Sequence, residues 1–293
     1  MLSKEIIAQI QKIQLKAGHL VTDALAGEYS SAFKGLGIEL EKVREYMEGD
    51  DVRAIDWNVT ARMNAPFVKI YKEERELTVM LMVDVSASLH FGTKGKFKNE
   101  TAAELAAILA FLATKNNDKI GLILFSDEVD HFIPPQKGRA HIWRIIRTIL
   151  TYETKPGAGT DLKKAFDFKA SISKRKTMCF LLSDFYDEGF EKGLRQIKSR
   201  HDVVCARLYD SAEESWPSLG LLSLRDSETS EELVVDTSSK SFQEAYRQDQ
   251  KEEREKLLKE FRRNRIDFFE VSTSGSPITP LVQYIRKRER TLR

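Results

Sequence analysis

The sequence predicts an α/β fold with a doubly wound, mostly parallel sheet. Residues 77–88 (LTVMLMVDVSAS) begin with a continuous apolar run and residues 177–185 form a second one, which is typical of strands buried on both faces. Residues 121–126, 203–209 and 266–272 predict further strands, and 131–135 an edge strand that ends at proline. Helix-like segments separate these strands, and that alternation favours right-handed crossovers within one sheet.

The helices follow from apolar spacing. Ile6, Ile10 and Ile13 begin a stripe spaced by three and four residues, which predicts an amphipathic helix over residues 5–25. Further helices are expected over 101–113, 141–150 and 161–170, and a long charged one over 241–265. Residues 219–236 are expected to form a two-stranded insertion.

The region before the first sheet strand has a different character. Residues 27–76 are rich in charge and glycine, and we expect short strands and loops there. We therefore divide the chain into an N-terminal segment, residues 1–75, packed on the sheet, and an α/β domain, residues 76–293.

Composition excludes several classes of protein. The 293 residues carry 47 Lys and Arg against 45 Asp and Glu, a formal charge of +2, which gives no indication of a nucleic-acid or membrane-surface partner. No apolar stretch is long enough to span a bilayer, and no secretory signal is recognisable, so we expect a cytoplasmic protein. Cys179 and Cys205 lie in apolar runs and are expected to be inert core thiols, and the five scattered histidines show no zinc-site spacing.

Three polar loops are expected to meet at one edge of the sheet, where ligands of open α/β sheets bind. Asp84, Ser86 and Ser88 end the first strand, Thr160 precedes a helix, and Asp184 ends the strand 177–185. All their donors are oxygens, the set preferred by a hard cation, most simply Mg²⁺, with Mn²⁺ or Ca²⁺ as alternatives. The D-x-S-x-S alternation would point the three side chains of the first loop the same way, and Gly157 and Gly159 would let the second loop bend toward them.

These loops, DVSAS, GAGTD and LLSD in that order, resemble the metal-ion-dependent adhesion site of von Willebrand factor A domains. The resemblance implies a von Willebrand factor A-like, Rossmann-like sheet in which Ser86, Ser88 and Thr160 bind the metal directly. It also implies that Asp84 and Asp184 act through water and that a partner's carboxylate completes the shell. The chain departs from the family pattern at Ala158 and Phe185, where glycine is frequent. The alternative is that Asp84, Ser86 and Thr160 only cap the turn and the helix that follow them.

A second resemblance covers the region from residue 28 to residue 88. GLGIEL, then REY, then GDDVRAIDWNVTARM and KEERE are similar to domain-of-unknown-function family 58, in its short form without membrane helices. Genes of that family commonly lie beside genes for MoxR-type AAA+ ATPases. The resemblance therefore implies a MoxR-type ATPase as partner, which the A-like domain would link to a client protein in a chaperone-like or complex-maturation assembly.

The same segment concentrates opposite charges and one large aromatic side chain. This cluster consists of Asp50, Asp51, Arg53, Asp56, Trp57 and Arg62. Such a cluster is typical of an ion-pair network that fixes an irregular segment onto the sheet, which we favour, or of a docking surface for a partner. An exposed Trp57 would favour the docking surface, because Trp and Arg dominate interface hot spots.

Two classes of function remain open. The first is a binding adaptor whose metal captures an acidic group of another protein, or, with a vestigial metal site, an adaptor that binds elsewhere. The second is a hydrolase that uses the same cation to polarise a substrate oxygen. We favour the non-enzymatic adaptor, because no general base, phosphate loop or GxSxG motif is recognisable.

Overall fold

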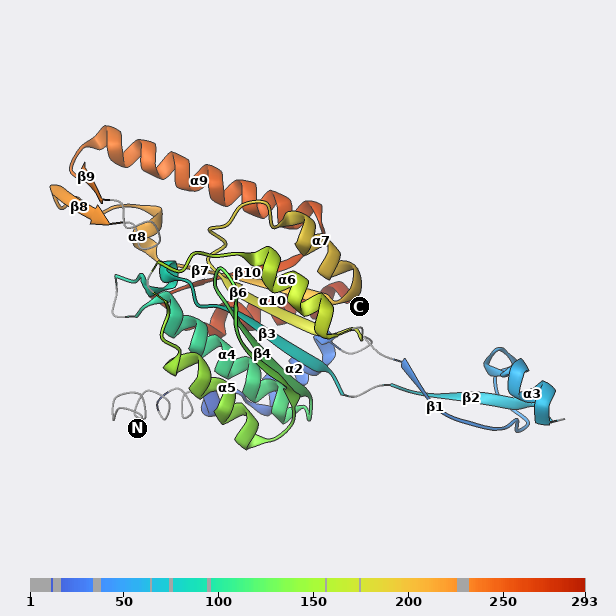
Figure 1. Cartoon of the computed structure of the whole chain (residues 1–293). Helices are drawn as coiled ribbons and strands as arrows, with labels where there is room; N and C mark the ends of the chain where they lie inside the picture. Colours follow the sequence, from blue (N-terminus) through green and yellow to red (C-terminus); the bar gives the residue numbers. More distant parts are fainter. Residues whose placement is uncertain are drawn as a thin grey trace.

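A six-stranded sheet forms the centre of the protein (Figure 1). The computed structural model describes residues 12, 17–33, 38–63, 65–73, 76–93, 96–155, 157–173, 175–225 and 232–292. Across the sheet the strand order is β10-β7-β6-β3-β4-β5. In chain order these strands are β3 (Thr78–Asp84), β4 (Lys119–Phe125), β5 (Val129–Gln136), β6 (Met178–Ser183), β7 (Asp202–Tyr209) and β10 (Asp267–Ser272).

Only the edge strand β5 runs antiparallel to its neighbour; the other pairs are parallel. Numbered by their order in the chain, the six strands are arranged 3-2-1-4-5-6, which is the doubly wound order. The predicted fold class, an α/β fold with a doubly wound, mostly parallel sheet, is therefore confirmed.

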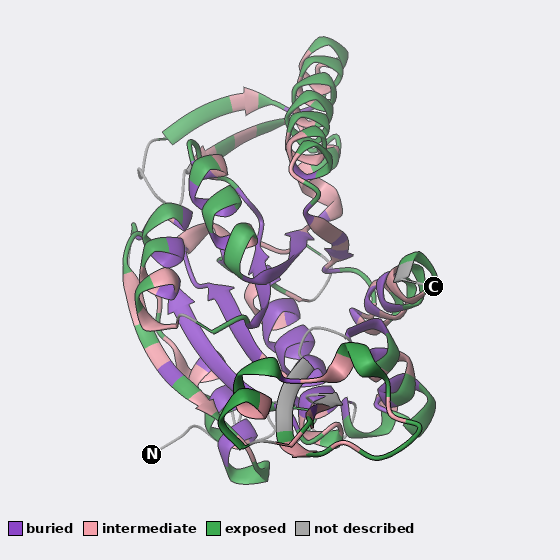
Figure 2. Cartoon of the chain, turned by 90° about the vertical axis from the view of Figure 1, so that its right-hand side faces the viewer, coloured by how far each residue is buried: buried purple, intermediate pink, exposed green. Residues whose placement is uncertain are grey.

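Helices cover both faces of the sheet, as Figure 1 shows. One face packs against α2 (Asp23–Phe33), α4 (Lys98–Lys115), α5 (Arg139–Thr151) and α10 (Ile278–Leu292). The other packs against α6 (Leu162–Ile172), α7 (Glu191–Arg200) and α9 (Lys240–Arg263). The strands are buried between these two layers (Figure 2).

Successive side chains of a strand enter opposite cores. In β3, Leu81 and Val83 lie in the core beneath α4, whereas Met80 and Met82 lie in the core beneath α6. Both sets are almost fully buried. This is why the sequence of β3 reads as a continuous apolar run, and each such side chain contributes about 1.5–3 kcal/mol of transfer free energy.

The start of the chain differs from the expectation. Most of the predicted helix 5–25 lies outside the described residues; residues 17–20 are helical, and a separate helix, α2, begins at Asp23. The hydroxyl oxygen of Thr22 accepts a hydrogen bond from the backbone N–H of Leu25 at 3.2 Å, which caps the new helix. Phe33 packs edge-on against Phe180 of β6, with ring centroids 6.0 Å apart. The expectation of loops and short strands, which rests on the charge and glycine of this region, is wrong for residues 27–33, because they belong to α2.

The segment of charge and glycine forms an arm, residues 38–73. Its strands β1 (Ile38–Glu45) and β2 (Phe67–Glu73) pair antiparallel, and η1 (Val52–Ala54) and α3 (Trp57–Met63) lie at the far end between them. The arm extends away from the six-stranded sheet (Figure 1). The expectation that this segment packs on the sheet is therefore wrong for the described part of the arm, since its strands satisfy their hydrogen bonds with each other. The division of the chain at residue 75 stays a prediction.

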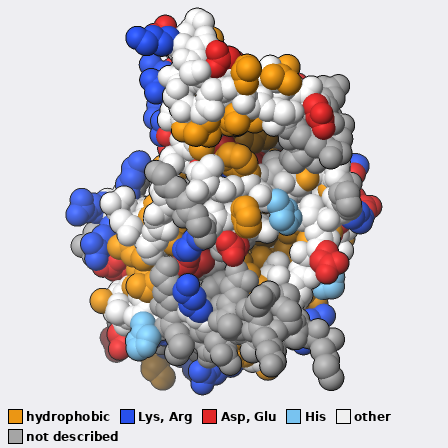
Figure 3. Space-filling view, turned by 90° about the vertical axis from the view of Figure 1, so that its left-hand side faces the viewer, with side chains coloured by type: hydrophobic (Ala, Val, Ile, Leu, Met, Phe, Trp, Pro, Cys, Tyr) orange, Lys and Arg blue, Asp and Glu red, His pale blue; other side chains and the backbone are white. Residues whose placement is uncertain are grey.

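A second extension lies at the opposite end of the molecule. After the short helix α8 (Ser211–Glu214), strands β8 (Leu221–Arg225) and β9 (Glu232–Asp236) pair as an antiparallel hairpin within the predicted insertion 219–236. Leu221 and Val234 are exposed there, and Figure 3 shows hydrophobic side chains on this face of the molecule. Among the described residues, no helix is both long and apolar enough to cross a membrane.

Candidate metal centre

The sheet brings two of the three predicted loops together directly. β3 and β6 are parallel neighbours, with Val83 opposite Leu182, so the residues that follow them emerge side by side. The loop before α6 joins them through a hydrogen bond from the backbone N–H of Ala87 to the carbonyl oxygen of Ala158, at 2.9 Å. The predicted meeting of the three loops is thus present in the structure.

Asp84 lies fully buried at the centre of this arrangement. One of its carboxylate oxygens accepts the backbone N–H of Ser86 at 2.9 Å, and the other accepts the hydroxyl of Ser183 at 2.6 Å. Burial, followed by repulsion from the nearby Asp184 carboxylate, raises the pKa of Asp84 to about 7, although the hydrogen bonds from Ser183 and Ser86 oppose the shift. Two buried carboxylates that repel each other favour a cation beside them.

The hydroxyl groups of Ser86 and Ser88 lie 3.0 Å apart. We expect strand alternation to bring these hydroxyls together, but a different local structure does so. The strand ends at Asp84, and residues 87–90 turn into the 3₁₀ helix η2 (Ala87–His90), which returns Ser88 toward Ser86. A tight turn therefore gathers the hydroxyls.

Thr160 contributes the third hydroxyl. Its Oγ1 is buried and has no hydrogen-bond partner in the part of the chain that the structure describes. Thr160 is not the cap of α6, because the neighbouring Asp161 caps it by accepting the backbone N–H of Lys164 at 2.9 Å. The capping alternative is therefore wrong for Thr160, and Gly157, at φ 74°, supplies the bend before it.

A buried lysine that the sequence reasoning missed lies beside Asp184. The ammonium nitrogen of Lys98, the first residue of α4, is 2.7 Å from Oδ2 of Asp184 and 2.6 Å from Oε1 of Glu213. Burial lowers the pKa of Lys98, but the two carboxylates outweigh it, and the net pKa is raised. A cation at the N-terminus of a helix opposes the helix dipole, which is the one signal in the sequence that could have indicated Lys98.

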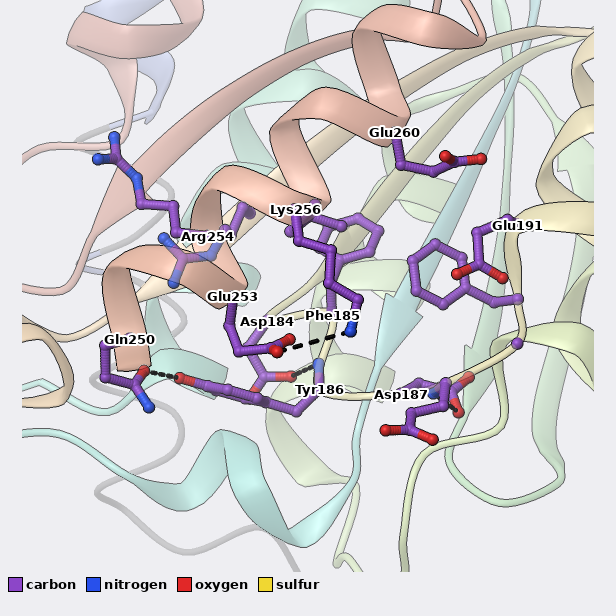
Figure 4. A pocket seen from close by; sticks show the side chains of 15 residues that line it. Asp184, Phe185, Tyr186, Asp187, Glu191, Gln250, Glu253, Arg254, Lys256 and Glu260 are labelled. Atoms are coloured by element: carbon purple, nitrogen blue, oxygen red, sulfur yellow. Dashed lines mark hydrogen bonds and ion pairs between the residues drawn. The ribbon is translucent and has the colours of Figure 1, made fainter. Parts of the chain in front are cut away.

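The loop after β6 also borders a cavity. Phe185 has φ 63°, the left-handed region, which explains why glycine is frequent at this position in the resembled family. The loop and α9 enclose a cavity of about 290 Å³, which has Asp184 and Tyr186 in its wall (Figure 4). The hydroxyl of Tyr186 donates to Oε1 of Gln250 on α9 at 3.0 Å.

The donor set fits a hard divalent cation. The three joined loops carry three hydroxyls and two carboxylates, and the Thr160 oxygen, which has no partner among the described residues, is the kind of buried group that a metal would satisfy. Ser86, Ser88 and Thr160 would hold the ion, and it would supply a positive charge that attracts an anionic group. Among the described residues no cluster of three His, Cys, Asp or Glu side chains forms a metal site of another type.

The candidate partner-binding residues lie far from this edge, on the arm. Asp50 accepts two hydrogen bonds from Arg44, both at 2.7 Å, and Asp51 accepts the backbone N–H of Arg53 at 2.9 Å. Asp56 caps α3 and lies 3.5 Å from the ammonium of Lys69. These acids hold the arm's own turns and do not fix it to the sheet.

By contrast, Trp57 is 67% exposed, and Arg53 and Arg62 are exposed as well. Met47, Val52 and Met63 are also large exposed apolar side chains of the arm. By the criterion stated above, the exposed Trp57 favours the docking surface over a purely structural role.

Comparison with known proteins places the chain among relatives. The family described as "Protein of unknown function DUF58" matches residues 42–256. The uncharacterized protein Rv1480 of Mycobacterium tuberculosis is 32% identical over 227 residues, which cover 77% of this chain and 72% of that protein.

Two solved structures match parts of the chain at low sequence identity. The conserved hypothetical protein BatB from Bacteroides thetaiotaomicron is 16% identical with a TM-score of 0.46, over 73% of this chain and 99% of that one. The SpRpn10 VWA domain is 11% identical with a TM-score of 0.35, over 45% and 75% of the two chains.

Proposed function

This chain belongs to the DUF58 family, and we propose that it is a cytoplasmic, divalent-cation-dependent protein-binding module. Its metal would lie at the carboxyl edge of the sheet and capture an acidic group of a partner protein. The observation that carries this proposal is the buried Thr160 hydroxyl oxygen, which has no partner among the described residues, on a loop that a backbone hydrogen bond joins to the turn of Ser86 and Ser88. A buried hydroxyl without a partner costs about 1–3 kcal/mol, and a bound cation would remove that cost.

The partner that we propose is a MoxR-type AAA+ ATPase, with a client protein bound by the same module or by the ATPase. The support is the resemblance of residues 28–88 to family 58, whose genes commonly lie beside genes for such ATPases. Mg²⁺ is the simplest cation for such a site, because oxygen donors and at least one water suit it.

Binding is a better proposal than hydrolysis. The structure adds Lys98 and Glu213 to this edge; the two carboxylates beside Lys98 raise its pKa and keep it protonated, and Glu213 is occupied by Lys98 and by the backbone N–H of Asp210. A protonated ammonium cannot act as a general base. Asp84 has both carboxylate oxygens occupied by hydrogen bonds from Ser86 and Ser183, which leaves it poorly placed to accept a proton from water.

The arm is a second candidate binding surface, which would serve an adaptor with a vestigial metal site. Its support is the exposure of Trp57 and of Val52, 67% and 59%, at a point that projects from the sheet. Large apolar side chains exposed together are typical of interaction sites in soluble proteins.

A pull-down distinguishes the two surfaces. The experiment measures capture of a MoxR-type ATPase, in Mg²⁺ and in EDTA, by three forms of this chain. These are the wild type, the double variant Asp84→Ala with Ser86→Ala, and the variant Trp57→Ala. Ser199→Ala, an exposed hydroxyl on α7, is the matched control. Capture that is lost both in EDTA and in the double variant supports the metal centre. Capture that survives both but is lost in Trp57→Ala assigns binding to the arm.

A further inference from the structure

Lys98 occupies the position of a built-in counter-ion at the candidate metal centre. Its side chain is only 1% exposed, and its ammonium lies 2.7 Å from Asp184 and 2.6 Å from Glu213. The aromatic rings of Phe91 and Tyr186 close over it, with centroids 5.9 Å and 5.5 Å from the nitrogen. The ammonium is therefore desolvated and held by both carboxylates and both rings.

A divalent cation at this edge would compete with that ammonium. Asp184 would contact the metal through water, so a double positive charge would approach the carboxylate that Lys98 already neutralises. Like charges repel strongly where water is largely excluded, as it is around Asp84 and Asp184, which are 0% and 2% exposed. Binding of the metal and full strength of the Lys98–Asp184 pair therefore oppose each other.

The second carboxylate that binds Lys98 belongs to a different part of the molecule. Glu213 lies in α8, and its other oxygen accepts the backbone N–H of Asp210 at 2.8 Å. Asp210 in turn accepts hydrogen bonds from Thr93 and from Thr273, which follows β10. A shift of Lys98 away from Asp184 would therefore strengthen its pair with a helix that leads into the β8–β9 hairpin.

We propose that Lys98 regulates the metal centre as a resident competing cation, which a divalent metal displaces from Asp184 toward Glu213 of α8. This inference rests on the proposed function for its metal. It makes the affinity of the site a property of the Lys98–Asp184–Glu213 triad, and it links occupancy of the centre to α8.

The test is calorimetric titration of Mg²⁺ and Mn²⁺ into metal-free protein. Lys98→Met removes the competing ammonium and is expected to raise the affinity for the metal at least about tenfold. The reason is that one nearby charge changes the proton affinity of a carboxylate by about ten- to thousandfold, and the proton is also a cation. Glu213→Gln leaves Lys98 to Asp184 alone and is expected to lower the affinity severalfold. Lys96→Met, which removes an ion pair with Glu104 on the same segment, is the control and should change nothing.

Lys98→Met leaves two buried carboxylates without a cation, which can prevent folding. The double variant Lys98→Met with Glu213→Gln leaves only the Asp184 carboxylate without its cation, and it should also bind the metal more tightly than the wild type does. Circular dichroism establishes that each variant is folded.

The outcomes separate this inference from the proposed function. Binding in the variants without Lys98 but not in the wild type supports the competition and sinks metal-dependent capture by the native chain. Equal or weaker binding without Lys98 overturns the competition while leaving the metal centre in place, because Lys98 would then only position Asp184. Absence of binding in every folded variant overturns both.

Discussion

Replacing Thr160 by valine removes one hydroxyl and should change stability in opposite directions with and without metal. The Thr160 oxygen is buried without a partner among the described residues. Its desolvation is uncompensated, so in EDTA the Thr160→Val protein should be as stable as the wild type or more stable, by up to about 1 kcal/mol. Most substitutions of a buried polar side chain destabilise a protein, which makes this sign informative.

Metal should reverse the order. With Mg²⁺ at about ten times its dissociation constant, linkage stabilises the wild type by about 1.4 kcal/mol and the variant by close to nothing. The assay is urea denaturation followed by circular dichroism, in EDTA and in Mg²⁺. Thr160→Ser, which keeps the hydroxyl, should retain the response to Mg²⁺. A variant that is clearly less stable than the wild type in EDTA, or that Mg²⁺ stabilises equally, would refute the reasoning.

Three further predictions concern Asp210 before α8, Trp57 on the arm and Gly121 in β4. Burial raises the pKa of Asp210, but hydrogen bonds from Thr273, Thr93 and the backbone of Ala212 outweigh it and lower the pKa to about 2. The ionised Asp210 therefore stabilises the folded state above about pH 4, the pKa of Asp in the unfolded chain, and this stabilisation is lost as the pH falls toward 2. Asp210→Asn should thus cost about 2 kcal/mol in urea denaturation at pH 7, with a gap to the wild type that narrows below pH 4, whereas a pH-independent gap would contradict it. Trp57→Ala should change the free energy of unfolding by less than about 0.5 kcal/mol, since the side chain is 67% exposed; a larger loss would mean that the arm packs on other residues. Gly121→Ala places a Cβ 2.8 Å from the carbonyl oxygen of Ile133 and should cost about 1–3 kcal/mol in thermal denaturation, so an unchanged midpoint would show that β5 shifts freely.

The sheet could be predicted from the sequence because burial on both faces leaves a local signal. The apolar runs that contain Leu81 and Leu181 lie between two hydrophobic cores, so every position in them is selected for the same property. The order of the loops then followed from topology, since parallel strands end at one edge.

The arm and α2 could not be predicted in the same way. Among residues 42–45 and 67–70 of its strands only Val68 is buried, so this part of the sequence shows weak alternation, and Trp57 reads as a core anchor in the sequence although it is exposed. In α2, Gly27 interrupts a stripe of which Tyr29 and Phe33 are the buried part. Burial of that face against α10 and the sheet decides its structure, and the sequence alone does not show those contacts.

The part of the centre that could not be predicted from the sequence is the cationic side chain of Lys98. Lys98 and Asp184 are 86 positions apart, and Glu213 lies 115 positions from Lys98. No spacing rule joins residues from the start of one helix, the end of a strand and a second, short helix. The hydroxyls of Ser86 and Thr160 belong to recognisable loops, whereas the lysine that neutralises the site can be found only once the chain is folded.

The most direct test of the metal centre is anomalous scattering from crystals of the protein soaked with Mn²⁺. We predict one ion at the carboxyl edge of the sheet, about 2.1 Å from the hydroxyl oxygens of Ser86, Ser88 and Thr160, with Lys98 moved from Asp184 toward Glu213. Crystals that show no ion there at millimolar Mn²⁺, with the Lys98–Asp184 pair intact, would contradict the account and direct attention to the arm.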